Sequence, residues 1–178
     1  MITGWHWWFG AISGVVLLTV AALPLAALVV WVLVRRREGT GAAWRRSMAE
    51  VGIVYGTVPW IWMIMLPGPR AGEVSGRVSL VPVRDLLAVL ASPPLTVVVQ
   101  VVGNLLVFAA LGFFGPIRFA ALASVPRILA LAAVCSALVE VLQHVLRLDR
   151  VSSVDDVLLN AAGAGLAALL SRRWWRTG

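Results

Sequence analysis

The stretch ISGVVLLTVAALPLAALVVWVLV, residues 12–34, decides the fold class of this chain. It carries no charged residue, and as a helix it is long enough to cross about 30 Å of hydrocarbon. No arginine or lysine precedes it, and Arg35, Arg36 and Arg37 follow it directly. It is therefore predicted to be a retained stop-transfer helix and not a cleavable signal peptide. Pro24 lies in its middle and predicts a kink.

Four further apolar stretches follow, so the sequence predicts an all-α, polytopic bundle of about five membrane-spanning helices. The predicted spans are residues 12–34, 51–66, 97–114, 128–146 and 154–170. A composition of 61% hydrophobic and 13% charged residues excludes an ordinary soluble domain. We divide the chain into an N-terminal helix with its basic loop (1–47), a four-helix membrane domain (48–171) and a basic tail (172–178).

The net charge of +7 comes from arginine, because the chain contains no lysine. These arginines lie at the ends of apolar stretches and not in one water-facing patch, which argues against nucleic-acid binding. With the amino terminus outside, ten arginines fall in cytoplasmic segments and five in outer segments. The positive-inside rule therefore predicts an outer amino terminus and a cytoplasmic carboxyl terminus.

The connection of residues 67–96 is too polar and too rich in Pro and Gly to cross a membrane. Within it, residues 83–91 are predicted to form a short interfacial helix with Leu86, Leu87 and Leu90 on its apolar side. Ser92 and two prolines would end this helix. We expect it to cover the outer mouth of the bundle.

Polar side chains occur at similar depths in three predicted spans: Asn104 in the third, Glu140 in the fourth and Asn160 in the fifth. A carboxylate inside hydrocarbon costs several kcal/mol, so such a residue faces the bundle interior or a wet cavity. We expect these three side chains to share one pocket that opens towards the outer surface.

Helical spacing extends this set into two polar stripes, because residues three, four and seven positions apart share a helix face. The first stripe contains Glu140, Gln143, His144 and Arg147, and the second contains Asp156, Asn160 and Gly163. Gly163 and Gly165 would let a neighbouring backbone come close. The two stripes are predicted to line the same pocket.

Structural roles remain open for each of these residues. Asp155 and Asp156 suit the first turn of a helix that Ser152 or Ser153 could cap. Asn104 and Asn160 could make only interhelical hydrogen bonds, Glu140 could pair with Arg147 or Arg150, and His144 could be an interfacial side chain.

The polar set admits acid–base chemistry by Glu140, Asp156 or His144, and its oxygen atoms could hold a hard cation. However, neither an HExxH, nor a GxSxG, nor a P-loop motif occurs in the sequence. We therefore predict no cofactor and no metal, leave catalytic residues unassigned, and favour binding over enzymatic activity.

Four motifs in order resemble the VanZ-like family of bacterial membrane proteins over residues 51–170. The L-x-P-F pattern is matched by Leu80, Pro82 and Arg84, and the N-x-x-x-F-x-P-x-G pattern by Asn104, Phe108 and Gly112. The S-x-x-x-E-x-x-Q pattern is matched by Ser136, Glu140 and Gln143. The closing R-x-x-x-x-D-D-x-x-x-N-x-x-G pattern is matched by Arg150, Asp155, Asp156, Asn160 and Gly163. The chain departs from the family in having Val83 for an aromatic residue, Ala110 for a proline, Ser153 for an acid and Ala167 for a glycine.

The resemblance implies a multi-pass protein of the bacterial plasma membrane, whose family namesake lowers susceptibility to the glycopeptide teicoplanin. On that basis we expect an outer-leaflet pocket that binds a membrane lipid, a lipid-linked cell-wall precursor or a lipoglycopeptide. Glu140 would be the central acceptor, oriented by other polar residues, and an arginine would meet an anionic headgroup. The expected ligand-binding residues are Glu140, Gln143, Asn104, Asn160, Asp156, Asp155, Arg150, Arg84, Arg147 and His144. The alternatives are a membrane-embedded enzyme that modifies an envelope lipid, and a scaffold or transport accessory.

Overall fold

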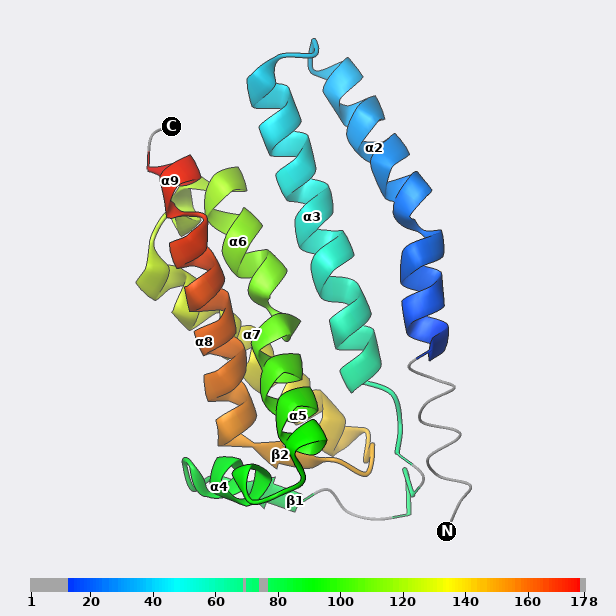
Figure 1. Cartoon of the computed structure of the whole chain (residues 1–178), viewed down its shortest axis with the longest axis vertical. Helices are drawn as coiled ribbons and strands as arrows, with labels where there is room; N and C mark the ends of the chain where they lie inside the picture. The colour runs from blue at the N-terminus through cyan, green and yellow to red at the C-terminus, as the bar shows by residue number, and fades with distance from the viewer. Residues whose placement is uncertain (1–12, 69, 74–76, 177–178) are drawn as a thin grey trace.

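The computed structural model describes residues 13–68, 70–73 and 77–176, and most of them are helical (Figure 1). A helical segment at residues 13–21 leads into the first labelled helix. The helices are α2 (Leu23–Arg36), α3 (Gly41–Ile64), α4 (Arg84–Leu90), α5 (Pro94–Val107), α6 (Ala109–Arg118), α7 (Val125–Val145), α8 (Val154–Leu170) and α9 (Arg172–Trp175), with one 3-10 turn, η1 (Ala120–Leu122). The predicted helical character of the chain is therefore confirmed.

Three helical stretches of the described residues are long and apolar enough to cross a membrane: Ser13–Arg36, Pro94–Arg118 and Val125–Val145. The predicted spans at 51–66 and 154–170 are also helical, as parts of α3 and as α8. However, α8 has only 17 residues and α3 begins with a polar turn that contains Arg45 and Arg46. Five spans and their orientation therefore remain predictions.

The α8 helix packs against α5, α6 and α7. Its small residues permit this, because a Cβ at Gly163 would overlap the backbone of Leu105 and one at Gly112 of α6 would overlap the backbone of Ala164. Gly165, in contrast, faces the side chain of Leu129 and not a backbone. The buried core around this contact consists of Val107, Phe108, Ile128, Ala132, Val139, Ala161, Ala164 and Ala168.

Two of the long apolar stretches contain an interruption of the helix, one of them near the predicted kink. Helical structure is interrupted at Ala22, two residues before Pro24, where a kink was predicted. The third apolar stretch is interrupted at Phe108, which separates α5 from α6 with φ −113° and ψ 13°. Phe108 is buried in the core, and Ala110 keeps its amide hydrogen. This interruption therefore does not require the proline that the family usually has at position 110.

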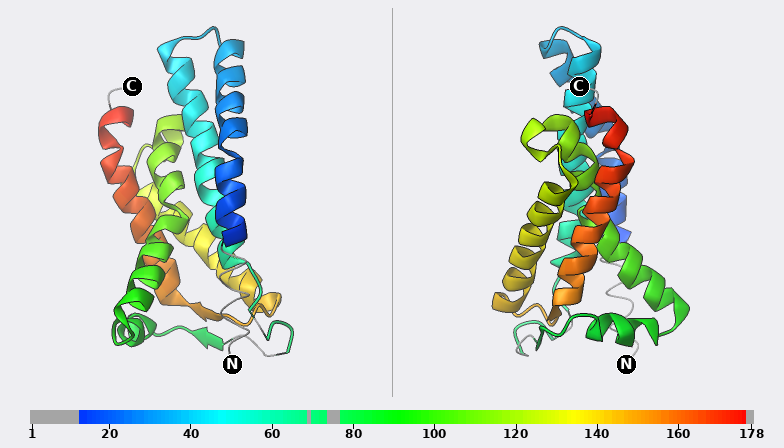
Figure 2. Two further views of the ribbon diagram at one scale, coloured as in Figure 1. Left: turned by 45° about the vertical axis from the view of Figure 1, so that its right-hand side comes forward. Right: turned by 90° about the vertical axis from the view of Figure 1, so that its left-hand side faces the viewer.

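A short parallel ladder joins the long connection to the start of α8. Strand β1 (Arg77–Ser79) pairs with β2 (Val151–Ser153), with Arg77 opposite Val151 and Ser79 opposite Ser153. The all-α prediction did not include this ladder. Figure 2 shows it beside α4 at one end of the bundle, with the α2–α3 turn and α9 at the other end. The short helix predicted at 83–91 is confirmed as α4, and its interfacial position stays a prediction.

Candidate ligand site beneath helix α4

A small pocket, partly open to the surroundings, lies between α4, α5 and α8. Its lining combines carboxylate and amide side chains with aliphatic ones. The residues are Asp85, Leu86, Val89, Gln100, Val101, Asn104, Asp155, Asp156 and Leu159. Three of the predicted site residues, Asn104, Asp155 and Asp156, therefore meet here.

Asn104 and Asp156 form the polar wall of this pocket. The side-chain amide of Asn104 donates a hydrogen bond of 2.6 Å to Oδ1 of Asp156. Both side chains are half-buried, and neither makes another side-chain hydrogen bond among the described residues. Oδ2 of Asp156 and Oδ1 of the Asn104 side chain are therefore available as acceptors for a ligand.

Asp155 lines the same pocket, but its carboxylate is occupied by the protein backbone. Its two oxygens accept hydrogen bonds from the amides of Val83, at 2.5 Å, and Leu86, at 2.9 Å. The residue is only 4% exposed. Val83 has a φ of +69°, a left-handed conformation that is strained for a β-branched residue. Asp155 thus holds the N-terminus of α4 and stabilises its strained entry.

Ser153 links β2 to two of the three pocket helices, α4 and α8. Its hydroxyl donates a hydrogen bond of 2.6 Å to Asp85 of α4 and accepts one of 3.2 Å from the amide of Asp155 at the start of α8. The hydrogen bond from Ser153, together with one from Ser79, lowers the pKa of the Asp85 carboxyl. Asp85 is therefore held in its charged form at the pocket.

Sequence reasoning missed Asp85 and Gln100 as lining residues. Gln100 lies one helical turn before Asn104 on α5, so the spacing of these two amides was a signal that could have identified it. Asp85 directly follows Arg84, but no local pattern indicates that α4 folds over α8. Its contact with Ser153 depends on the β1–β2 ladder, which brings the two segments together.

Glu140 lies outside the pocket lining, on α7 beside β2. Its Oε2 accepts a hydrogen bond of 3.1 Å from the amide of Ser153, and its carbonyl oxygen accepts one of 3.1 Å from the hydroxyl of Ser152. The carboxylate of Glu140 thus fixes the strand from which Ser153 reaches α4. In the part of the chain that the structure describes, it makes no hydrogen bond with Asn104 or Asn160.

Arg150 connects the two regions electrostatically. Its guanidinium interacts with the charges of Asp156, Glu140 and Asp149. Nη2 donates to the carbonyl oxygen of Leu66 at 3.3 Å, whereas the buried Nε has no hydrogen-bond partner among the described residues. Burial lowers the pKa of Arg150, although the nearby carboxylates oppose this shift. The side chain therefore supplies positive charge between the Glu140 region and the pocket.

The remaining predicted residues lie elsewhere. Asn160 is 2% exposed, and its side-chain amide donates a hydrogen bond of 2.7 Å to the hydroxyl of Ser136. The side-chain oxygen Oδ1 of Asn160 has no partner among the described residues. Gln143 donates to the carbonyl oxygen of Ile64 at 2.8 Å and joins α7 to α3. The side chains of Arg84, His144 and Arg147 are exposed. The predicted set is therefore divided among several environments instead of one pocket.

Two features bear on a metal or an anionic ligand. Within the described residues, no three His, Cys, Asp or Glu side chains are grouped so that they could hold a metal ion. No arginine lines the pocket, whose charged residues are Asp85, Asp155 and Asp156. The geometry consequently favours a ligand that offers hydrogen-bond donors or positive charge.

Comparison with known proteins identifies the family. A family model described as VanZ/LLP1 matches residues 53–175, which is more than half of the chain and includes α4 to α8. No curated protein and no solved structure matched the chain. The match confirms the resemblance drawn from the four motifs, and with the three apolar helical stretches it indicates a membrane protein. The chain belongs to the VanZ/LLP1 family.

Proposed function

We propose that the protein is a multi-pass protein of the bacterial plasma membrane with five spans, an outer amino terminus and a cytoplasmic carboxyl terminus. The distribution of arginine supports this topology, because the α2–α3 turn, the α6–α7 connection and α9 lie towards one end of the bundle (Figure 1). These segments and the helix ends that adjoin them carry ten of the fifteen arginines. In this orientation the pocket beneath α4 opens at the outer leaflet.

The proposed function is binding of an envelope lipid or a lipid-linked cell-wall precursor, which would alter the response to lipoglycopeptides such as teicoplanin. The observation that carries it is the Asn104–Asp156 pair, which presents free acceptors inside a pocket at the end of the bundle. Hydroxyl and ammonium groups of a lipid headgroup are suitable donors for these acceptors. The exposed aliphatic side chains of Leu87 and Leu90 on α4 are suited to contact with acyl chains.

Within this proposal the acidic residues have different roles. Asp156 and Asn104 contact the headgroup, because they line the pocket with unused acceptor atoms. Asp155 and Glu140 are positioning residues, since their carboxylates bind backbone amides of α4 and β2. Arg150 balances the charge of Asp156 and Glu140.

Native mass spectrometry tests this function on protein purified from its membrane in a mild detergent. The variants are Asp156→Asn and, as a matched control, Glu38→Gln, which also removes one negative charge but lies exposed in the α2–α3 turn. We expect wild type and Glu38→Gln to retain an envelope lipid and Asp156→Asn to retain roughly tenfold less, which corresponds to about 1.4 kcal/mol.

Two outcomes would overturn the binding function. Equal lipid retention by all three proteins, or none by any of them, would favour a scaffold role. A chemically altered lipid that only the wild type and Glu38→Gln produce would favour an enzyme. Melting temperatures of the three purified proteins show whether a loss of lipid reflects unfolding instead.

A further inference from the structure

The two ends of the molecule differ strongly in charge. The end formed by the α2–α3 turn, the α6–α7 connection and α9 carries ten arginines and only two acidic residues, Glu38 and Glu50. The opposite end, with α4 and the β1–β2 ladder, carries five arginines and six acidic residues. The net charges are therefore +8 and −1, which together give the +7 of the chain.

Most arginines of the positive end have no carboxylate to neutralise them. Glu50 accepts hydrogen bonds from Arg37, at 2.9 Å, and from Arg118, at 2.5 Å, so one acid serves two arginines. Among the described residues no carboxylate pairs with seven others, all of them exposed. These are Arg35, Arg36, Arg45, Arg46, Arg127, Arg172 and Arg176.

The short helix α9 is fixed to the bundle, which holds its arginines in place. The indole nitrogen of Trp175 donates to the carbonyl oxygen of Ala168 at 3.3 Å, and the ring of Trp174 contacts Phe113 with centroids 5.4 Å apart. Arg45 of α3 donates to the carbonyl oxygen of Trp174, so α9 is also joined to α3. Less conformational entropy is then lost when α9 binds a partner.

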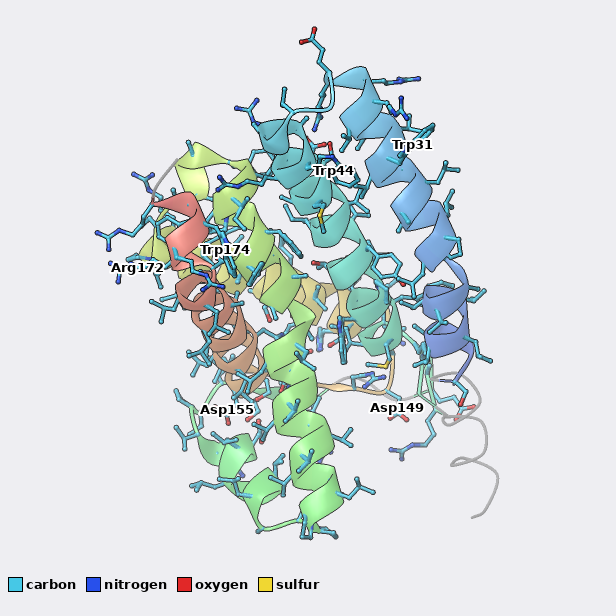
Figure 3. All side chains as sticks on the ribbon, turned by 45° about the horizontal axis from the view of Figure 1, so that its top comes forward. Trp31, Trp44, Asp149, Asp155, Arg172 and Trp174 are labelled. Atoms are coloured by element: carbon cyan, nitrogen blue, oxygen red, sulfur yellow. The ribbon has the colours of Figure 1, made fainter. Side chains whose placement is uncertain are left out.

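Tryptophan side chains surround this positive end. Figure 3 places Trp31, Trp44, Trp174 and Arg172 towards the same end of the bundle, and Asp149 and Asp155 towards the other. All three of these tryptophan residues are exposed, by 48%, 45% and 36% respectively. Exposed tryptophans prefer the headgroup layer of a membrane, where the neighbouring arginines would meet lipid phosphates.

We propose that this end is a binding site for anionic phospholipids, centred on Arg46 of α3 and on Arg172 and Arg176 at α9. Guanidinium groups bind phosphate oxygens through paired hydrogen bonds, and the surplus positive charge attracts a lipid with net negative charge. The acyl chains of such a lipid would lie along the apolar helices, on the side of the tryptophans that faces the middle of the membrane. The site is separate from the pocket beneath α4 and does not depend on its ligand.

Native mass spectrometry of the purified full chain in a zwitterionic detergent tests the site, with added phosphatidylglycerol or phosphatidylcholine as the probe. We expect preferential retention of phosphatidylglycerol, and at least tenfold weaker retention by the triple variant Arg46→Gln, Arg172→Gln, Arg176→Gln. The matched control, Arg77→Gln, Arg84→Gln, Arg147→Gln, removes the same charge at the opposite end and should retain the lipid like wild type.

Further measurements distinguish binding of an anionic lipid from other causes of lipid retention. Because the attraction is electrostatic, retention of phosphatidylglycerol should fall as salt is raised. Inorganic phosphate at the same concentration as the lipid should not displace it, since it lacks acyl chains; displacement would overturn the lipid assignment. Equal retention of the two lipids, or equal losses in the two triple variants, would also overturn it. Melting temperatures confirm that both variants remain folded.

Discussion

The side chain of Asn104 on α5 donates a hydrogen bond of 2.6 Å to the carboxylate of Asp156 in the first turn of α8. This bond is part of the pocket wall. It joins two helices that also touch through Gly163 and the backbone of Leu105. A donor to an ionised carboxylate is stronger than a neutral hydrogen bond. The pair therefore has a structural effect that can be measured without knowledge of the ligand.

Replacing Asn104 with alanine should lower the free energy of unfolding in detergent by about 1–2 kcal/mol, because Asp156 loses the one side-chain hydrogen-bond donor that it has among the described residues. Gln100→Ala is the matched control: it removes an amide one turn away on α5 that makes no side-chain hydrogen bond among the described residues. In a double-mutant cycle with Asp156→Ala, an interaction energy near zero would show that the bond is absent in the folded protein.

Replacing Asp155 with asparagine should loosen α4 without removing the pocket acceptors. One of its two backbone contacts needs an acceptor that an amide nitrogen cannot supply, and the charge is also lost. Hydrogen exchange at the amides of Val83 and Leu86 should become roughly tenfold faster, which corresponds to about 1.4 kcal/mol. Asp156→Asn serves as the control, and equally fast exchange in that variant would contradict the distinction between the two acids.

The helices were largely predictable because their limits are set by local chemistry. The apolar run 154–170 follows Ser153, which caps it, and is followed by charged Arg172, and α8 has these bounds. The β1–β2 ladder could not be predicted, because three-residue strands far apart in sequence have no local signature.

The site was only partly predictable, because the level of a side chain along its helix and the direction in which it points depend on different features of the fold. Counting residues at 1.5 Å each gives the level of a side chain along its helix. It does not give the rotation of that helix against its neighbours. Asn160 therefore faces Ser136, whereas Asn104 faces Asp156, although both amides were expected in one pocket.

Replacing Gly163 with alanine should destabilise the bundle by roughly 1–3 kcal/mol, because the added Cβ overlaps the backbone of Leu105 and α8 must move away from α5. Gly103→Ala provides the control on the facing helix, since a Cβ there meets no atom within 4 Å. That change should leave stability unaltered or raise it by up to about 1 kcal/mol through helix propensity. Unfolding of both variants in detergent measures the difference, and a wild-type stability for Gly163→Ala would refute the close packing.

Acidification should weaken the attachment of α4 through Asp85. Hydrogen bonds from Ser153 and Ser79 lower the pKa of Asp85 in the folded protein below its ordinary value. The stabilisation is therefore complete above the ordinary pKa of about 4 and is lost as the pH falls through the lowered value. Thermal unfolding at about pH 5 and at about pH 3 measures this loss. Other carboxylates titrate as well, so the readout is the difference from Asp85→Asn; parallel pH profiles would contradict the prediction.

Thiol labelling in intact cells should show which side of the membrane each end of the bundle faces. In a Cys135→Ser background, Glu73→Cys and Glu38→Cys place single thiols at exposed positions in the loop before β1 and in the α2–α3 turn. An impermeant maleimide should label Glu73→Cys and leave Glu38→Cys unlabelled until the cells are opened, because the +8 end is expected to stay in the cytoplasm. The reverse pattern would place the pocket beneath α4 on the cytoplasmic side, where it could not receive a ligand from the outer leaflet. Labelling of both variants in intact cells would mean that an even number of spans separates the two loops, which would contradict the assignment of α3 as a span.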